Sequence, residues 1–459
     1  MRPAPSPLRS VDLLELGRSV AGAARTGEEI EAYVVRSRDV DVNAFNGEVE
    51  SLATAEIEGV GVRVIVDGRQ GYAWAGSLDP EVVADTLADA RDNAGFGAPD
   101  EFYGLVTPDE FAGIEATELD LFREELLSVP TSDKVALAIE LEAATKAVDP
   151  RIRGLRSASY GDAAAESAVV NSHGVEVSTR RTVCSCSAYA MAGDGDDTQT
   201  GGGYSVGRAF GDLDLNEAAH DAAERAVRLL GAKQPASRRL PVVLDPQVTR
   251  SFISLIGSAL SAEAIQKGRS MFVAREGEEV AAPGVTLVDD PTLADAFGAA
   301  SYDAEGVPTR PLGLIGRGRL DAFLHNVYTA RRGATTTTGS AVRGGFKSPP
   351  GVGARALHLV PGELSPEEIL ASVPEALFVQ SVSGLHSGTN PVSGDFSVGA
   401  EGLMVRGGEF AEPVREITIA STLQRMLHDI VHIGSDLEWL PGGAAGMTLL
   451  LGEMSVAGR

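Results

Sequence analysis

The sequence has few cysteines, few aromatic residues and no long apolar run. Its 459 residues include only two cysteines, Cys184 and Cys186, and aromatic residues make up 5% of the chain. Residues two positions apart on a strand share a face, but one strand does not readily bring their sulfur atoms into disulfide geometry. We therefore expect two buried or half-buried free thiols, which fits a reducing compartment such as the cytosol.

Targeting signals and basic charge are also lacking. The first seven residues, Met1–Pro7, carry prolines and no apolar signal-peptide core, and no window is apolar for the length that a membrane helix needs. We therefore expect a cytoplasmic protein with no membrane association. Lys and Arg number 39 against 65 Asp and Glu, a formal charge of −26. So acidic a surface repels phosphate backbones, and we expect no direct binding to nucleic acid.

Glycine and proline are abundant, with 53 and 23 residues, which indicates many turns and β connections rather than a long helical bundle. A chain of this length exceeds what one hydrophobic core normally supports. The segment Gln234–Arg239 has the composition of a linker. The sequence thus predicts an α+β protein of two domains. The N-terminal domain, residues 8–233, is expected to be a mixed α/β antiparallel-sheet domain, and the C-terminal domain, residues 240–459, to be β-rich.

Hydrophobic periodicity predicts the secondary structure along the chain. Helices are expected at Leu13–Ala24, Pro80 to about Asn93 with Asp79 as cap, Ser132–Ala147, Asn216–Gly231 and Pro246–Gly268. N-terminal strands are expected at Glu31–Arg36, Val49–Ile57, Val60–Val66, Tyr72–Ala75, Gly154–Tyr160, Ser167–Asn171, Val175–Val183 and Ser185–Met191. Later strands are expected at Leu240–Asp245, Gly313–Leu324, Ala356–Val360, Leu377–Val382, Gly402–Val405 and Thr448–Val456. The Asp67-Gly68 pair predicts a hairpin turn.

Two histidines four residues apart, His428 and His432, have the spacing at which a helix presents two zinc ligands. If Leu423–Ile433 is helical, both rings share a face, and Asp436 or Glu438 could supply a third ligand. The metallopeptidase motif requires Glu after the first His, however, and this chain has Asp there. We favour ordinary surface or interface histidines and keep a metal site at this pair as a minor alternative.

Other polar clusters have structural explanations. The acidic loop Ala192–Asp197 lacks the later Glu of an EF-hand loop, so a solvated loop is expected. Thr335–Thr338 has no Lys or His at a spacing that activates a hydroxyl, and we expect an extended strand or loop that could face a peptide substrate. A last group comprises the carboxylates Asp289, Asp290, Asp303 and Glu305. Turn capping explains them better than an aspartic-protease pair that shares a proton.

The most informative stretch ends the predicted helix 246–268 and contains Ala262-Glu263-Ala264-Ile265-Gln266-Lys267. It forms an ordered set with three downstream segments, residues 288–292, 302–309 and 394–402. In order and spacing, this set resembles the TldD/PmbA family over nearly the whole chain. The resemblance implies a heterodimer whose TldD half carries a His-Glu-x-x-x-His zinc helix and a late Cys. Its TldE (PmbA) half shares the fold and lacks the metal.

At the positions of the zinc motif this chain keeps only Glu263. Ala262 stands at the first His position and offers no lone pair, and Lys267 stands at the second, where its ammonium repels a cation. No cysteine follows Cys186, so the late thiolate is missing as well. Glu263 is expected to pair with Lys267 one helical turn on. The resemblance therefore implies a chain with no catalytic residue and no metal of its own, with zinc in the partner.

The function implied is that of a non-metal-binding partner subunit in a TldD/TldE-type zinc metallopeptidase, which shapes the chamber for proteolysis of unfolded or precursor peptides. Expected partners are a TldD-like zinc-bearing subunit and a peptide substrate, and a homodimer of the isolated chain stays open. The main alternative is a metal-free homodimeric peptide-binding or regulatory protein, of the kind described as gyrase modulators. A third hypothesis is an independent hydrolase that uses the His428/His432 pair.

Overall fold

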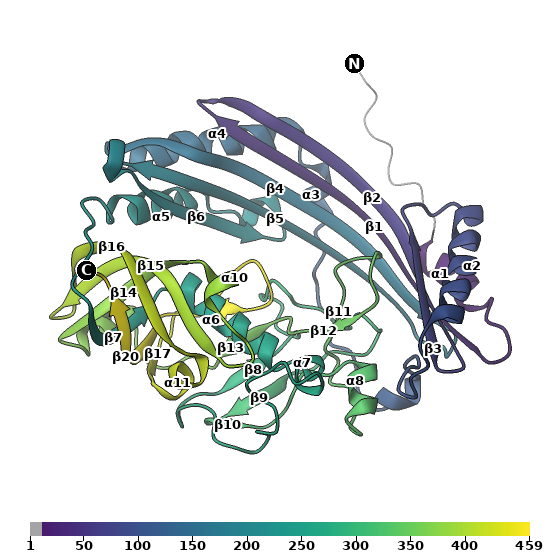
Figure 1. Ribbon diagram of the computed structural model, residues 1–459. Helices are drawn as coiled ribbons and strands as arrows, with labels where there is room; N and C mark the ends of the chain where they lie inside the picture. The colour runs from purple at the N-terminus through teal and green to yellow at the C-terminus, as the bar shows by residue number, and fades with distance from the viewer. Residues whose placement is uncertain (1–11) are drawn as a thin grey trace.

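The computed structural model describes residues 12–459. The proline-rich start and the first four residues of the expected N-terminal domain, 8–11, lie outside the described residues. The described chain is an α+β structure, which confirms the predicted class. A long curved sheet built from the first half of the chain arches over the second half (Figure 1). Among residues 12–459, no helix is both long and apolar enough to cross a membrane.

The N-terminal sheet has six strands in the order β3-β2-β1-β4-β5-β6, and each neighbouring pair is antiparallel. The strands are β1 (Glu28–Phe45), β2 (Glu48–Val66), β3 (Arg69–Ala75), β4 (Ile152–Asn171), β5 (Glu176–Ala192) and β6 (Gln199–Gly207). The predicted hairpin between β2 and β3 is confirmed. Asp67 and Gly68 both have positive φ, 50° and 68°, as a two-residue turn of the type I′ requires.

The long strands are continuous, and our prediction was wrong to divide β2, β4 and β5 into shorter pieces. We predicted separate strands at Val49–Ile57 and Val60–Val66, and Gly59 lies between them. In the structure, a Cβ at Gly59 would lie 2.5 Å from the Phe346 ring, and one at Gly61 would lie 2.1 Å from the Tyr72 hydroxyl. These glycines therefore let the Phe346 segment approach the sheet closely, and they do not end the strand.

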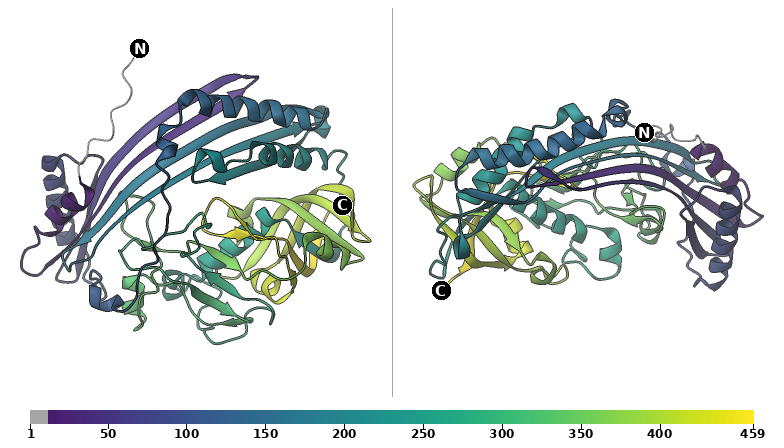
Figure 2. Two further views of the ribbon diagram at one scale, coloured as in Figure 1. Left: turned by 180° about the vertical axis from the view of Figure 1, so that it is seen from behind. Right: turned by 90° about the horizontal axis from the view of Figure 1, so that it is seen from above.

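Two pairs of helices cover one face of this sheet. The N-terminal helices are α1 (Leu13–Ala21), α2 (Pro80–Phe96), α3 (Glu125–Ser128), α4 (Thr131–Val148) and α5 (Leu215–Val227). Apolar residues of β1 pack with α1 and α2 at one end (Ile30, Ala32, Val34) and with α4 and α5 at the other (Val40, Val42, Ala44). All are even-numbered, so they share one face of the strand. Figure 2 shows α4 and α5 running along the sheet beside each other.

Caps explain where two of these helices begin. Asp79 precedes α2 and accepts a hydrogen bond from the Glu81 N–H, with Pro80 as the first helical residue, as predicted. Asp12 caps α1 in the same way through the N–H groups of Leu14 and Glu15. After α5 the chain leads through residues 228–237 into β7, the first strand of the second sheet.

The C-terminal half is built on a second six-stranded sheet, in the order β16-β15-β14-β7-β20-β17. Its strands are β7 (Arg238–Leu244), β14 (Glu375–Ser383), β15 (Asp395–Arg406), β16 (Glu409–Thr422), β17 (Ile430–Ile433) and β20 (Leu449–Ala457). A further pairing of β16 with β20 joins five of these strands into a ring. The largest hydrophobic core of the described chain lies here and includes Phe252, Ile253 and Ile256 of α6.

Smaller elements complete this half. A four-stranded sheet, β10-β9-β8-β13, and two short hairpins pack beside the main sheet. Their strands are β8 (Leu287–Asp289), β9 (Leu312–Gly316), β10 (Arg319–Leu320), β11 (Ala341–Val342), β12 (Gly351–Val352), β13 (Leu357–Leu359), β18 (Glu438–Trp439) and β19 (Ala445–Gly446). The helices are α6 (Pro246–Ala259), α7 (Ala262–Gln266), α8 (Val327–Arg332), α9 (Pro366–Ala371), α10 (Leu385–Gly388) and α11 (Leu423–His428).

The single long helix predicted for 246–268 is wrong, because the chain leaves helical geometry between α6 and α7. Ser261 is extended, with φ −65° and ψ 126°. The loop residue Leu324 forms two backbone hydrogen bonds across this break. Its N–H donates to the Leu260 carbonyl (3.0 Å), and its carbonyl accepts from the Ala262 N–H (2.9 Å). This tertiary contact takes hydrogen-bonding groups that a continuous helix would use, and periodicity does not reveal it.

Candidate functional site

Two of the three positions of the degenerate zinc motif, Ala262 and Glu263, lie on α7, and the third, Lys267, is the C-cap residue of this helix. Ala262 is buried, and its side chain at the first motif position is a methyl group. Glu263 and Lys267 form the predicted i, i+4 ion pair, with an O–N distance of 2.5 Å. Their side chains are 45% and 49% exposed, so the pair is a surface interaction of small energy. The one carboxylate that the motif retains is therefore held by the lysine beside it.

A zinc ion does not fit this helix. The Ala262 methyl has no lone pair, and the Lys267 ammonium would stand beside the cation with the same sign of charge. Zinc in a peptidase needs three protein ligands of the His, Cys, Asp or Glu type. Throughout residues 12–459, no group of three or more such side chains is placed to hold a metal ion. No catalytic step is therefore assigned to α7.

The helical arrangement on which the His428/His432 alternative depended is wrong. Helix α11 ends at His428, and after Asp429 the chain enters β17, which contains His432 and pairs with β20. The N–H of Gly452 on β20 donates to the Asp429 carbonyl (2.7 Å), so sheet pairing begins where a helix would continue. The two rings therefore do not occupy one helical face at a spacing of one turn.

The threonine loop follows α8, a helix that contacts α7 through the Gln266 side chain. As predicted, Thr335–Thr338 is a loop, and its first two residues are exposed. Thr337 and Thr338 each donate a hydroxyl hydrogen bond to the His325 carbonyl, at 3.2 and 3.1 Å. The Gln266 side chain of α7 donates to the Thr329 carbonyl of α8 (2.7 Å). These two hydroxyls therefore brace the backbone, and among residues 12–459 neither hydrogen-bonds to a histidine, lysine or carboxylate side chain.

Turn capping explains Asp290 and Asp303, as the sequence predicts, whereas Asp289 bonds to the backbone of a distant segment. Asp303 is buried and accepts hydrogen bonds from the N–H groups of Glu305, Val307 and Ala341. Asp289 is also buried and accepts from the N–H groups of residues 355 and 356. Burial raises the pKa of Asp289 to about 6, although these backbone donors oppose the shift. Burial and the neighbouring Glu305 carboxylate raise the pKa of Asp303.

Glu305 has a different role, which the sequence did not reveal. It belongs to a chain of buried charges that joins the N-terminal sheet to the C-terminal half. Arg63 of β2 contacts Glu31 of β1 at 2.6 Å and Glu305 at 3.3 Å. Arg343 contacts the other oxygen of Glu31. The four side chains are between 1% and 6% exposed. We call Glu31, Arg63, Glu305 and Arg343 the buried ion-pair network.

The protonation of this network follows from competing effects. Burial alone would raise the pKa of Glu31, but the guanidinium groups of Arg343 and Arg63 outweigh it and lower the pKa below its ordinary value. Arg343 also donates to the Ala304 carbonyl (3.1 Å) and lies over the Tyr33 ring, 5.0 Å from its centroid. Its partner Glu31 is 312 positions away along the chain. Local sequence patterns do not predict a contact between residues so far apart in the chain.

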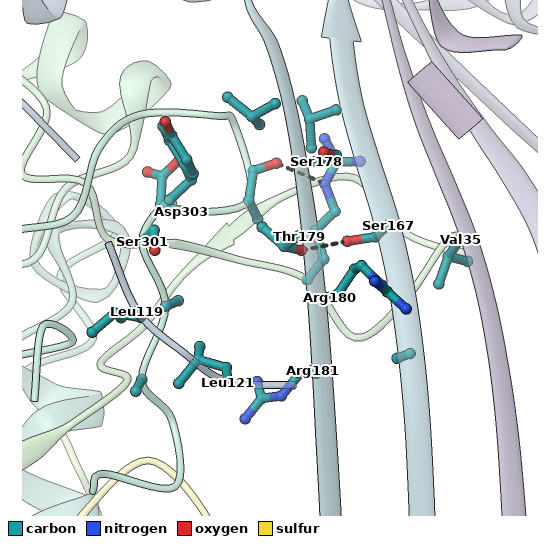
Figure 3. Close-up of a pocket in the computed structure, with 18 of the residues that line it drawn as sticks. Val35, Leu119, Leu121, Ser167, Ser178, Thr179, Arg180, Arg181, Ser301 and Asp303 are labelled. Atoms are coloured by element: carbon teal, nitrogen blue, oxygen red, sulfur yellow. Dashed lines mark hydrogen bonds between the residues drawn. The ribbon is translucent and has the colours of Figure 1, made fainter. Parts of the chain in front are cut away.

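A cavity of about 340 Å³ lies next to this network. Odd-numbered residues of β1 and β4, which face away from the covering helices, form one wall together with the β5 residues 177–181. The rest of the lining comes from the loop 299–304 and from Leu119, Leu121, Arg343 and Arg355. Figure 3 shows Arg180 and Arg181 on opposite sides of strand β5, with Ser301 and Asp303 across the cavity. Arg181 donates to the Phe297 carbonyl (2.6 Å). Burial, with the charges of Arg208 and Arg355, lowers its pKa to about 10.

Comparisons with known proteins cover nearly the whole chain. Three family models match in order: PmbA/TldA metallopeptidase domain 1 at residues 30–94, the central domain at 124–230, and the C-terminal domain at 237–458. Metalloprotease PmbA of Escherichia coli O157:H7 is 28% identical over 95% of this chain and 94% of its own. A metalloprotease of Methanothermobacter thermautotrophicus is 28% identical over 91% of this chain and 90% of its own.

Solved structures have the same fold. A Thermotoga maritima protein described as a candidate modulator of a DNA gyrase has a TM-score of 0.88 and 26% identity, with 96% of this chain and 99% of that chain covered. TldE from Thermococcus kodakarensis has a TM-score of 0.85 and 23% identity, covering 97% of this chain and 99% of that one. At that identity the second comparison concerns the fold alone.

Proposed function

Because the chain belongs to the TldD/PmbA metallopeptidase family, we propose that it is the metal-free partner subunit of a two-subunit zinc peptidase. In this proposal a TldD-like subunit supplies the zinc and the catalytic Glu. The chain described here completes the chamber and shapes the path of an unfolded or precursor peptide in the cytoplasm. One observation carries the proposal: a full metallopeptidase-family fold has Ala262 and Lys267 where zinc ligands belong.

The paired state of Glu263 supports this division of labour. A catalytic Glu in a zinc peptidase must take a proton from the metal-bound water. Here the only carboxylate of the motif is neutralised by Lys267 on the protein surface. A chain that retained activity of its own would need another base and another metal site. Within the described part of the chain, none of the candidate clusters provides both.

The test is reconstitution. The chain is purified alone and mixed with the TldD-like subunit from the same genome, the one that carries His-Glu-x-x-x-His. We expect a 1:1 complex by size-exclusion chromatography with light scattering, and cleavage of an unfolded peptide only by the mixture. A chelator should abolish that cleavage, and elemental analysis should place the zinc in the partner. The variant Glu263→Gln should cleave the peptide at a rate within about twofold of the wild-type complex, because a surface ion pair contributes little to stability.

Two results would contradict the proposal. The first is peptide cleavage by the isolated chain that a chelator does not reduce. The second is one zinc per isolated chain, lost in the variant His428→Ala. A stable homodimer that binds peptide, ignores the TldD-like subunit and cleaves nothing would favour the alternative of a metal-free peptide-binding or regulatory protein.

A further inference from the structure

The cavity beside the buried ion-pair network concentrates positive charge in a strongly acidic protein. The chain carries a formal charge of −26, yet four arginines line this one cavity: Arg180, Arg181, Arg343 and Arg355. Two of them are already paired with carboxylates, Arg180 with Glu166 (2.8 Å) and Arg343 with Glu31. The other two, Arg181 and Arg355, form no ion pair with any described residue.

Arg181 and Arg355 are held in place by backbone carbonyls. Arg181 donates to the Phe297 carbonyl (2.6 Å), and Arg355 donates to the Ala341 carbonyl (3.0 Å). A carbonyl positions a guanidinium without neutralising its charge. Further donors stay unused, since the Nε of Arg355 and the Nη1 of Arg343 are buried and lack a hydrogen-bond partner among residues 12–459. The arrangement thus leaves two positioned positive charges uncompensated.

The carboxylates nearby are not available to neutralise them. Asp303, which lines the cavity, accepts three backbone hydrogen bonds, one from each of residues 305, 307 and 341. Asp289 accepts two from the backbone at residues 355 and 356. Neither carboxylate forms an ion pair with Arg181 or Arg355 in the described chain. An external anion is the remaining way to balance Arg181 and Arg355.

The rest of the cavity indicates what kind of anion fits. Apolar side chains line it beside the arginines: Val35, Leu119, Leu121, Val169 and Val177. A volume of about 340 Å³ accommodates a small group with an apolar part. An inorganic anion would leave that apolar surface without a partner. A peptide end, with one side chain and one carboxylate, meets both requirements.

We propose that this cavity is a carboxylate subsite for a peptide, in which Arg181 and Arg355 bind the α-carboxylate and the valine and leucine side chains receive the last side chain. The inference rests on the proposed function for the nature of the ligand, an unfolded peptide. It does not depend on the zinc-bearing partner, because every residue involved belongs to this chain.

The experiment measures peptide binding to the isolated full-length chain by fluorescence anisotropy. The probe is the pentapeptide Ala-Ala-Ala-Ala-Leu, which carries fluorescein at its N-terminus and a free carboxylate at its C-terminus. The same peptide with a C-terminal amide is the comparison. Because the carboxylate would accept charge-assisted hydrogen bonds that the amide cannot, we expect the acid peptide to bind at least about tenfold more tightly than the amide peptide.

Variants locate the effect. Arg181→Gln and Arg355→Gln should each remove most of the preference for the acid, and Arg355→Lys should retain part of it because the charge stays. The matched control is Arg156→Gln. It removes the same charge from an exposed arginine of β4 in the same sheet, which lies over the Tyr189 ring at 5.9 Å and does not line the cavity. It should keep the preference within about twofold.

Three outcomes would overturn the inference. Equal affinity of the acid and amide peptides would exclude a carboxylate subsite. A preference that survives both Gln variants, in proteins whose circular dichroism matches the wild type, would place the site elsewhere. Displacement of the peptide by millimolar inorganic phosphate, with the amidated peptide displaced equally, would indicate a small-anion site. Because the assay contains no partner and no zinc, failure of heterodimer formation would leave this measurement unaffected.

Discussion

The buried ion-pair network predicts a large and specific loss of stability when Glu31 is neutralised. In Glu31→Gln the side chain keeps nearly the same size, but Arg343 loses its only carboxylate partner among the described residues, and Arg63 retains only Glu305, at 3.3 Å. Because the three side chains of Glu31, Arg63 and Arg343 are 1%, 6% and 2% exposed, water does not compensate. Removing one partner of a buried pair costs about 3–5 kcal/mol, and we expect this range.

The assay is urea unfolding at pH 7.5 followed by tryptophan fluorescence. The chain has two tryptophans, and Trp74 of β3 packs against Phe346 with ring centroids 5.9 Å apart. In a Trp439→Phe background, Trp74 therefore reports where the Arg343 segment meets the N-terminal sheet. The control Glu263→Gln removes an exposed i, i+4 pair and should cost about 0.5 kcal/mol or less.

The pH dependence provides a second check. The pKa of Glu31 is lowered in the folded protein, so its contribution is present above the unfolded pKa of about 4.5 and is lost as pH falls through the folded value. The stability difference between wild type and Glu31→Gln should therefore shrink below about pH 4. A difference under about 1 kcal/mol at pH 7.5, or a deficit that stays constant to low pH, would refute the reasoning.

Two further predictions concern other buried groups. Cys184 and Cys186 are each 1% exposed, and burial raises their pKa values to about 12 and about 11. At pH 8 we expect no reaction of the native protein with a thiol reagent and two equivalents in urea, and rapid native labelling would contradict this. The raised pKa of Asp289, about 6, destabilises the folded state as pH rises from about 4 to 6. As pH rises from 4 to 8, the free energy of unfolding of Asp289→Asn should therefore increase relative to that of wild type by up to about 2–3 kcal/mol. Urea unfolding measures this difference, and a difference that does not change with pH would contradict a raised pKa at Asp289.

Local features of the fold were accessible from the sequence. The hairpin at Asp67-Gly68 and the cap at Asp79 depend on a few adjacent residues, and the structure confirms both. The two free, buried thiols at Cys184 and Cys186 follow from their spacing on one strand, and they too are confirmed. The Glu263–Lys267 pair was predicted from the helical spacing of four residues. In each case the energy that decides the structure acts between near neighbours in sequence.

Long-range contacts overrode local signals elsewhere. The two strands predicted at Val49–Ile57 and Val60–Val66 are one strand, and Gly59 and Gly61 within it allow a close approach of the Phe346 segment. The helix predicted to run through Ser261 ends because Leu324 hydrogen-bonds to the backbone on both sides of it. The helix through His432 that the minor metal-site alternative required is absent from the described chain, because residues 430–433 pair with β20. These outcomes depend on groups that only folding brings together.

The sequence by itself determined the family resemblance and the loss of the zinc ligands at Ala262 and Lys267, because ligand chemistry depends on side-chain identity at fixed positions. Tertiary structure alone decided which charges meet. Arg343 pairs with Glu31 across 312 positions, whereas Arg181 and Arg355 line one cavity and, within the described part of the chain, their guanidinium groups hydrogen-bond only to backbone carbonyls. The physical reason is that the energy of a buried charge depends on its surroundings in space, and burial at these positions is created only when the sheet closes over the C-terminal half.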